Sequence, residues 1–243
     1  MRRITATAVH GEQPMNTIRQ QATWYRQIAA VVFRHGYLKG FGTTLFISLF
    51  FAAYFYLLKN PHYPTTVMPV IWLDSLIDFQ PLALPIYLSI WVYVSLPPAL
   101  LATRHQLYGY GLSMAAMCLA GLLVFFFWPT TVPAAVIDWS QHPEVSLLKN
   151  IDASGNACPS LHVATAFFSG LWLHRLLPGF AVPRWILTIN WAWCLAIVYS
   201  TLATRQHVAV DVLAGLALGA LAAHWSWRQC MDARQDAHVQ AST

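Results

Sequence analysis

The sequence predicts an all-α, polytopic membrane protein. Apolar residues make up 57% of the chain and charged residues only 9%, whereas typical globular domains contain about 25% charged residues. A body of 243 residues cannot hide so much apolar surface, so lipid must solvate part of it. Six segments are apolar and close to the roughly 20 residues needed to cross a bilayer. They are 41–58, 81–102, 109–128, 159–177, 185–203 and 207–227.

The chain divides into three parts around this predicted six-helix bundle. Residues 1–40 form a basic N-terminal segment, residues 41–228 the transmembrane domain, and residues 229–243 a short polar tail. In the N-terminal segment, apolar residues recur at steps of three and four, which indicates an amphipathic helix lying in the membrane interface. These residues are Ile18, Ala22, Tyr25, Ala29 and Val32.

The distribution of Lys and Arg predicts how the bundle is oriented. With a cytoplasmic N-terminus, only Lys59, Lys149 and Arg205 of the 14 basic residues fall on the opposite side. Cytoplasmic loops carry the excess of basic residues, so both termini are expected in the cytoplasm. The net charge of +5 is explained by attraction of these basic residues to anionic lipid headgroups. No nucleic-acid-binding motif accompanies them. The starts of the fourth and sixth segments then share the non-cytoplasmic face.

Ionisable residues interrupt the apolar pattern at the start of the sixth segment. Such residues are costly inside a membrane and need a partner or a function. His207 and Asp211 are four residues apart, so they should lie on one helical face, where the carboxylate can reach the imidazole. An Asp that holds one ring nitrogen leaves the other nitrogen free to act as base or nucleophile.

A second polar cluster begins the fourth segment. We expect Pro159 at the first helical position, after Cys158 as a poor capping residue. The amides around Ser160 and Leu161 would then remain available to bind an anion, with help from the Ser160 hydroxyl. His162 on the first turn could protonate a departing oxygen. A phosphate cradle, an oriented His and a second His together favour phosphate-ester chemistry.

These residues resemble the paired motifs of the type 2 phosphatidic acid phosphatase superfamily. Residues 159–162 match its Pro-Ser-x-His motif, and Ser200, His207 and Asp211 match its Ser-Arg-x5-His-x3-Asp motif. The resemblance implies a six-helix core, a site at one membrane face and no metal or other cofactor. It also implies that His207 attacks phosphorus to form a phosphohistidine, that His162 protonates the leaving group, and that Asp211 orients the nucleophile.

The chain departs from the family pattern at two places. Thr201 replaces the motif arginine, which would grip phosphate with two hydrogen bonds. The upstream Lys-x6-Arg-Pro motif is absent, and residues 129–133 read Pro-Thr-Thr-Val-Pro there. This style is closer to the branch that contains inositol phosphorylceramide synthases. On the predicted face of the site, the candidate phosphate-binding residues are Ser160, Ser200, Arg205 and Lys149.

The expected function is cleavage of a lipid phosphate ester or pyrophosphate at the periplasmic or exterior face of a membrane, which we expect to be a bacterial inner membrane. The expected partners are the lipid phosphate and membrane lipids, without nucleic acid. A lipid phosphotransferase that passes the phosphoryl head group to a lipid alcohol would share the first half-reaction. Two remote alternatives are a haem protein that uses His162 and His207 as axial ligands and a transporter with an Asp-His proton relay. Asp74 and Asp78 could bind a head group, although a cap or a solvated loop also explains them.

Overall fold

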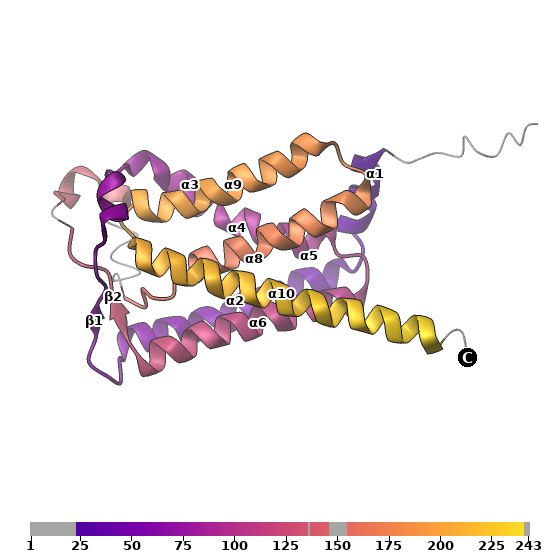
Figure 1. Cartoon of the computed structure of the whole chain (residues 1–243), viewed down its shortest axis with the longest axis horizontal. Coiled ribbons are helices and arrows are strands. Elements are labelled where there is room, and N and C mark those ends of the chain that lie inside the picture. Colours follow the sequence, from indigo (N-terminus) through magenta and orange to yellow (C-terminus); the bar gives the residue numbers. More distant parts are fainter. Residues whose placement is uncertain (1–22, 136, 146–154, 241–243) are drawn as a thin grey trace, which may run out of the picture.

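The computed structural model describes residues 23–135, 137–145 and 155–240, with side chains up to Trp227. This part of the chain is mostly helical, as predicted. Within the described residues, the longer helices are α1 (Trp24–Val32), α2 (Gly36–Lys59), α6 (Arg104–Phe127), α8 (Leu161–Leu176), α9 (Arg184–Ala203) and α10 (Ala209–Gln240). They run along the long axis of the molecule, apart from the short α1 at one end (Figure 1).

Five stretches of the described chain are long and apolar enough to cross a membrane, which indicates a membrane protein. They are Gly36–Lys59, Pro81–Leu100, Arg104–Phe127, Arg184–Ala203 and Ala209–Trp227. The remaining predicted span corresponds to α8, which has only 16 residues. Because Val163, Ala164 and Phe168 of α8 are fully buried, this helix packs in the interior of the bundle. Six crossings therefore remain a prediction.

The second predicted span is not one continuous helix. It is divided into η2 (Pro81–Ala83), α3 (Leu84–Leu88), α4 (Ile90–Tyr93) and α5 (Leu96–Leu100). Pro85 and Pro97 lack the N–H that a helix interior needs. Ser89 and Ser95 donate their hydroxyls to the carbonyls of Ile86 and Trp91, respectively, which further bends the chain.

Two glycines let α10 approach α8 closely. A Cβ at Gly215 would lie 2.5 Å from the Ser160 carbonyl oxygen, and one at Gly219 would lie 2.6 Å from the Ala164 carbonyl oxygen. Small residues four apart permit such backbone contact between membrane helices. This packing brings the start of α8 against the start of α10.

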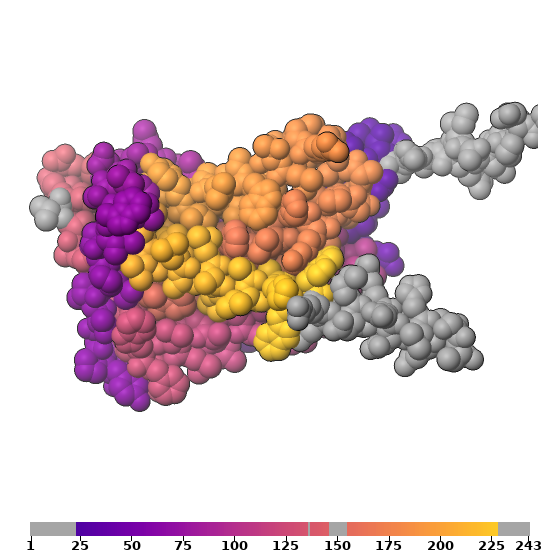
Figure 2. All heavy atoms as spheres, viewed as in Figure 1, coloured from indigo at the N-terminus to yellow at the C-terminus, as the bar shows by residue number. Residues whose placement is uncertain are grey.

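Loops and short elements gather at the end of the bundle where α8 and α10 begin (Figure 1). Strands β1 (Thr66–Val67) and β2 (Thr130–Thr131) pair in parallel there. The segment that follows β1 contains η1 (Trp72–Leu76) and lies over the start of α10 on the face shown in Figure 2. The described chain also contains the short helices η3 (Trp139–Gln141) and η4 (Leu177–Phe180).

The predicted N-terminal amphipathic helix is described only in part. Residues 1–22 lie outside the described residues, and α1 begins at Trp24. No side chain of α1 is buried, and Tyr25 is 53% exposed. The ammonium of Lys39 donates to the carbonyls of Val31 and Ala99, which ties α1 to α5. The placement of α1 in the membrane interface stays a prediction.

Candidate active site

His207 and Asp211 lie together at the start of α10. His207 Nδ1 is 3.5 Å from Asp211 Oδ2, and Asp211 is fully buried. This distance suits an ion pair but is longer than a well-formed hydrogen bond. The expectation that both residues lie on one helical face was wrong, because α10 begins only at Ala209. Asp211 instead reaches back past the helix start and accepts a hydrogen bond from the Val208 amide at 3.1 Å.

A tight turn presents His207 ahead of the helix. The carbonyl of Thr201 accepts the amides of both Gln206 and His207. Arg205, which directly precedes Gln206, adopts a left-handed backbone with φ of 56°. Thr201 stands where the family motif has arginine. It is fully buried, and its carbonyl holds this turn.

The start of α8 differs from the prediction. Ser160, not Cys158, is the capping residue, and its hydroxyl accepts the Val163 amide at 3.3 Å. The Cys158–Pro159 peptide bond is cis, and Pro159 precedes the helix. The Ser160 amide is also not free, because it donates to the Asp211 carbonyl at 3.1 Å. This bond joins the two sequence motifs directly.

Thr130 of β2 holds the chain that leads into α8. Its hydroxyl oxygen accepts the Cys158 amide at 2.8 Å, and its carbonyl accepts the Ala157 amide at 3.3 Å. Thr130 is buried at 1% exposure. The Pro-Thr-Thr-Val-Pro segment thus occupies the site end of the bundle as a neutral structural support.

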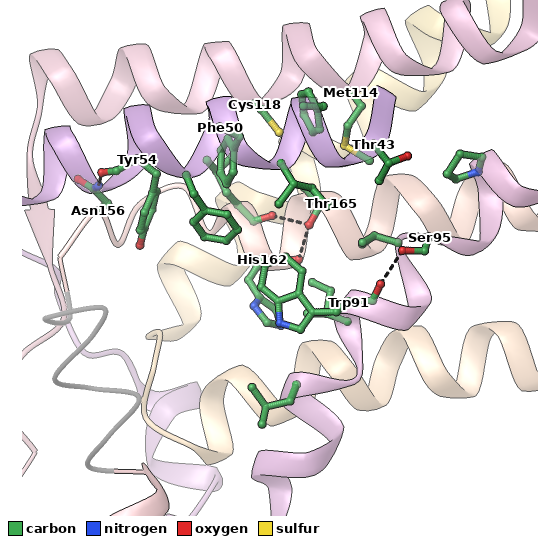
Figure 3. Close-up of a pocket in the computed structure, with 18 of the residues that line it drawn as sticks. Thr43, Phe50, Tyr54, Trp91, Ser95, Met114, Cys118, Asn156, His162 and Thr165 are labelled. Carbon is green, nitrogen blue, oxygen red and sulfur yellow. Dashed lines mark hydrogen bonds between the residues drawn. The ribbon is translucent and has the colours of Figure 1, made fainter. Parts of the chain in front are cut away.

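His162 is the second residue of α8, as expected for a side chain on the first turn. His162 and His207 both line a cavity with a volume of about 430 Å³. Figure 3 shows His162 in this cavity. The rest of the wall is mostly apolar and comes from α2, from α3 to α5, and from α6. Representative lining residues are Phe46, Phe50, Tyr87, Trp91, Met114 and Cys118.

Several buried polar atoms near this cavity have no hydrogen-bond partner within the described part of the chain. They are His162 Nε2, His207 Nδ1, Asp211 Oδ1 and both amide atoms of Gln206. Buried polar atoms are nearly always paired in folded proteins, so a group left unpaired calls for an explanation. Of these atoms, His162 Nε2 belongs to a residue that lines the cavity, and His207 Nδ1 lies 3.5 Å from Asp211 Oδ2.

The described residues that were predicted to bind phosphate, Ser160, Ser200 and Arg205, are not among those that line the cavity. Ser200 is fully buried and donates its hydroxyl to the Ile197 carbonyl at 2.6 Å. The Arg205 guanidinium donates to the carbonyls of Asp74 and Ile77, at 3.3 and 2.9 Å. Lys149 lies outside the described residues.

One contributor was missed by the sequence analysis, and the role of a second was given only as one of several possibilities. Tyr87 stacks on His162, and neither sequence motif contains it. A cap was one predicted role of Asp74, but the sequence did not indicate which helix it caps. It is buried, and its Oδ1 accepts the Ala209 amide at 2.7 Å, so it caps α10 from a distant segment. An acidic residue in an apolar stretch was the available signal for Asp74.

Comparison with known proteins gives a family. The PAP2 superfamily matches residues 102–235, which include His162, His207 and Asp211. Among curated proteins, no match is found. Members of this superfamily are phosphatases or phosphotransferases that act on phosphate esters. Since the match covers more than half of the sequence, the chain belongs to the PAP2 superfamily.

Proposed function

We propose that the protein is an integral-membrane lipid-phosphate phosphatase that cleaves a phosphate ester or pyrophosphate through a phosphohistidine. The observation that carries this proposal is the cavity shared by His162 and His207, whose walls are otherwise largely apolar. A polar end next to an apolar cavity suits a substrate with a charged head group and a hydrocarbon chain.

The dimensions of the cavity support a lipid chain. Its lining residues on α2 extend from Thr43 to Phe55. At 1.5 Å of rise per residue, these positions span about 18 Å along the helix. A small phosphomonoester would leave most of this apolar length empty, whereas a hydrocarbon chain would fill it.

The proposed chemistry assigns one step to each residue. His207 Nε2 forms a bond to phosphorus while the bond to the leaving oxygen breaks, and the electron pair of that bond goes to the oxygen. Protonated His162 gives its Nε2 proton to this oxygen. Asp211 stabilises the His207 ring through Nδ1. In the second half-reaction, the oxygen of a water molecule forms a bond to phosphorus while neutral His162 takes a proton from that water. The bond between phosphorus and His207 Nε2 breaks, its electron pair returns to the nitrogen, and phosphate is released.

Ser160 is fully buried and keeps one hydrogen-bond donor that its capping contact does not use. Its hydroxyl oxygen accepts the Val163 amide, but the hydroxyl hydrogen can still donate to a phosphate oxygen. We expect Ser200 and Arg205 to support the turn before His207, since their donors already reach backbone carbonyls. Lys149 stays a proposed ligand.

The distribution of charge supports a site on the non-cytoplasmic face. Lys39 and Arg104 near the starts of α2 and α6, and Arg175 and Arg184 near the α8–α9 connection, belong to the end of the bundle opposite the site. The positive-inside rule places that end in the cytoplasm. The site then faces the periplasm or exterior, and we propose a bacterial inner membrane.

Transfer to a lipid alcohol is the second candidate function. The specific observation is the neutral support around Thr130, in the region where the hydrolytic pattern has basic residues. This replacement is the feature that favours the inositol phosphorylceramide synthase-like branch. A phosphotransferase would release inorganic phosphate only slowly unless a lipid alcohol were present.

Phosphate release by the purified, detergent-solubilised protein tests the proposal. The panel contains long-chain alkyl phosphates, phosphatidate and polyprenyl pyrophosphate, each with and without a lipid alcohol. Substrate that is labelled in its phosphate should also leave an acid-labile phosphohistidine adduct on the protein. We expect His207→Ala to abolish both phosphate release and this labelled adduct, whereas the control His105→Ala, at an exposed position, should retain both. Unchanged release by His207→Ala on every hydrolysed lipid would refute the mechanism. Strict dependence on the alcohol would favour the phosphotransferase.

A further inference from the structure

Tyr87 holds His162 through two different contacts. The two rings are stacked, with centroids 4.0 Å apart and an interplanar angle of 19°. The backbone of Tyr87 is also hydrogen-bonded to His162. We assign this bond to Nδ1, because His162 Nε2 has no hydrogen-bond partner in the described chain. The ring of Tyr87 therefore sets the plane of the imidazole, and the backbone of Tyr87 sets which ring nitrogen is bonded.

The fold holds Tyr87 rigidly enough for this task. Tyr87 is 7% exposed and packs with Leu84 and Val145, and Phe79 lies against the same cluster. It belongs to α3, the short helix that ends where Ser89 bends the chain. The break in the predicted span thus turns an aromatic ring, which a straight helix could present to lipid, toward α8.

These contacts favour the form of His162 that an acid needs. When Nδ1–H donates to a carbonyl, the tautomer is fixed and Nε2 becomes the nitrogen that exchanges its proton. Figure 3 shows His162 within the cavity, beside the residues that line it.

We propose that Tyr87 is a positioning residue that aims Nε2 of His162 at the leaving oxygen during the first half-reaction. This inference rests on the proposed function, in which His162 is the acid. It adds a requirement outside both sequence motifs: the ring of Tyr87 is needed when the leaving group must receive a proton. A leaving group that departs as a stable anion should depend on Tyr87 much less.

The test compares phenyl phosphate with p-nitrophenyl phosphate, because these two substrates are similar in shape but differ in their need for a proton. Tyr87→Leu keeps the backbone carbonyl and removes the ring. We expect it to lower kcat on phenyl phosphate by about 10- to 100-fold, and on p-nitrophenyl phosphate by less than about threefold. Tyr87→Phe keeps the ring and should retain the wild-type ratio of the two rates.

Phe50→Leu is the matched control, since Phe50 lines the same cavity and is partly buried in the adjoining core. It should change both rates by the same factor. An equal loss on both substrates in Tyr87→Leu would overturn the positioning role and leave Tyr87 as a packing residue. If the wild-type protein releases phosphate from neither these substrates nor the lipids, the proposed function itself fails.

A second measurement does not depend on turnover. The ¹⁵N shifts of the His162 ring report which nitrogen carries the proton. We expect the Nδ1–H tautomer at high pH in the wild type and in Tyr87→Phe. In Tyr87→Leu the carbonyl remains, but the ring that holds the plane of the imidazole is gone, so the imidazole can turn away from the carbonyl and we expect a mixture of tautomers. A mixture already present in the wild type, or no change in Tyr87→Leu, would contradict the inference.

Discussion

Gly215 offers a sharp test of how the two motifs are held together. A Cβ at this position would lie 2.5 Å from the Ser160 carbonyl oxygen and 3.1 Å from the Val163 Cβ. The closer atom belongs to the backbone, so no side chain can rotate to make room. Gly215→Ala must therefore separate the starts of α8 and α10.

The size of this separation follows from the contact distances. Ordinary van der Waals contact begins at 3.4 Å, so the Ser160 carbonyl must move away by about 0.9 Å. Such a shift would stretch the bond between the Ser160 amide and the Asp211 carbonyl, now 3.1 Å long. Overpacking costs about 1–3 kcal/mol, offset by about 1 kcal/mol from the better helix propensity of Ala.

The effect on activity should exceed the effect on stability. A displacement of about 1 Å between reacting groups can lower the rate by about 100-fold. We expect Gly215→Ala to lose activity on this scale in the phosphate-release assay while its thermal unfolding temperature in detergent falls only modestly. The control is Gly111→Ala on α6, where an added Cβ meets nothing within 4 Å. Wild-type kcat in Gly215→Ala would refute the claim that this contact sets the distance between His162 and His207.

Three further predictions concern the support around the site. Asp74→Ala removes the acceptor for the Ala209 amide and should destabilise the protein by about 1 kcal/mol; equal thermal stability of Asp74→Ala and wild type in detergent would contradict this capping role. Thr130→Val leaves the buried Cys158 amide without its acceptor and should lower the free energy of unfolding by about 1–3 kcal/mol. Thr130→Ser keeps the hydroxyl and should keep the wild-type stability. A Val variant as stable as the Ser variant would exclude the hydrogen bond as a source of stability. Burial, with a smaller repulsion from Asp211, raises the pKa of the Cys158 thiol to about 11. Below that pH the thiol stays protonated, so Cys158 should resist maleimide labelling at pH 7–8 until the protein unfolds, and rapid labelling of the folded protein would disprove its burial.

Local pattern explains which parts of the site could be predicted from sequence. His207 and Asp211 are close in the chain, so their contact required only a short turn or one helical step. The contact formed across a turn rather than along a helix, but the same two side chains meet. Arg205 shows the limit of such reasoning: its charge and its position predict phosphate binding, which stays a prediction, but they do not predict which groups of the chain it contacts. Its carbonyl partners come from Asp74 and Ile77, residues too distant in sequence for any spacing argument to find.

The sequence by itself determined the membrane class, the helical content and the two motifs that carry the proposed chemistry. These features depend on composition and on residues within a few positions of one another. Only the tertiary structure decided where α8 begins, how the second predicted span is broken, and that Tyr87 and Asp74 reach the site. Each of these outcomes depends on contacts between segments far apart in the chain. Packing geometry selects those contacts, and local periodicity does not encode it.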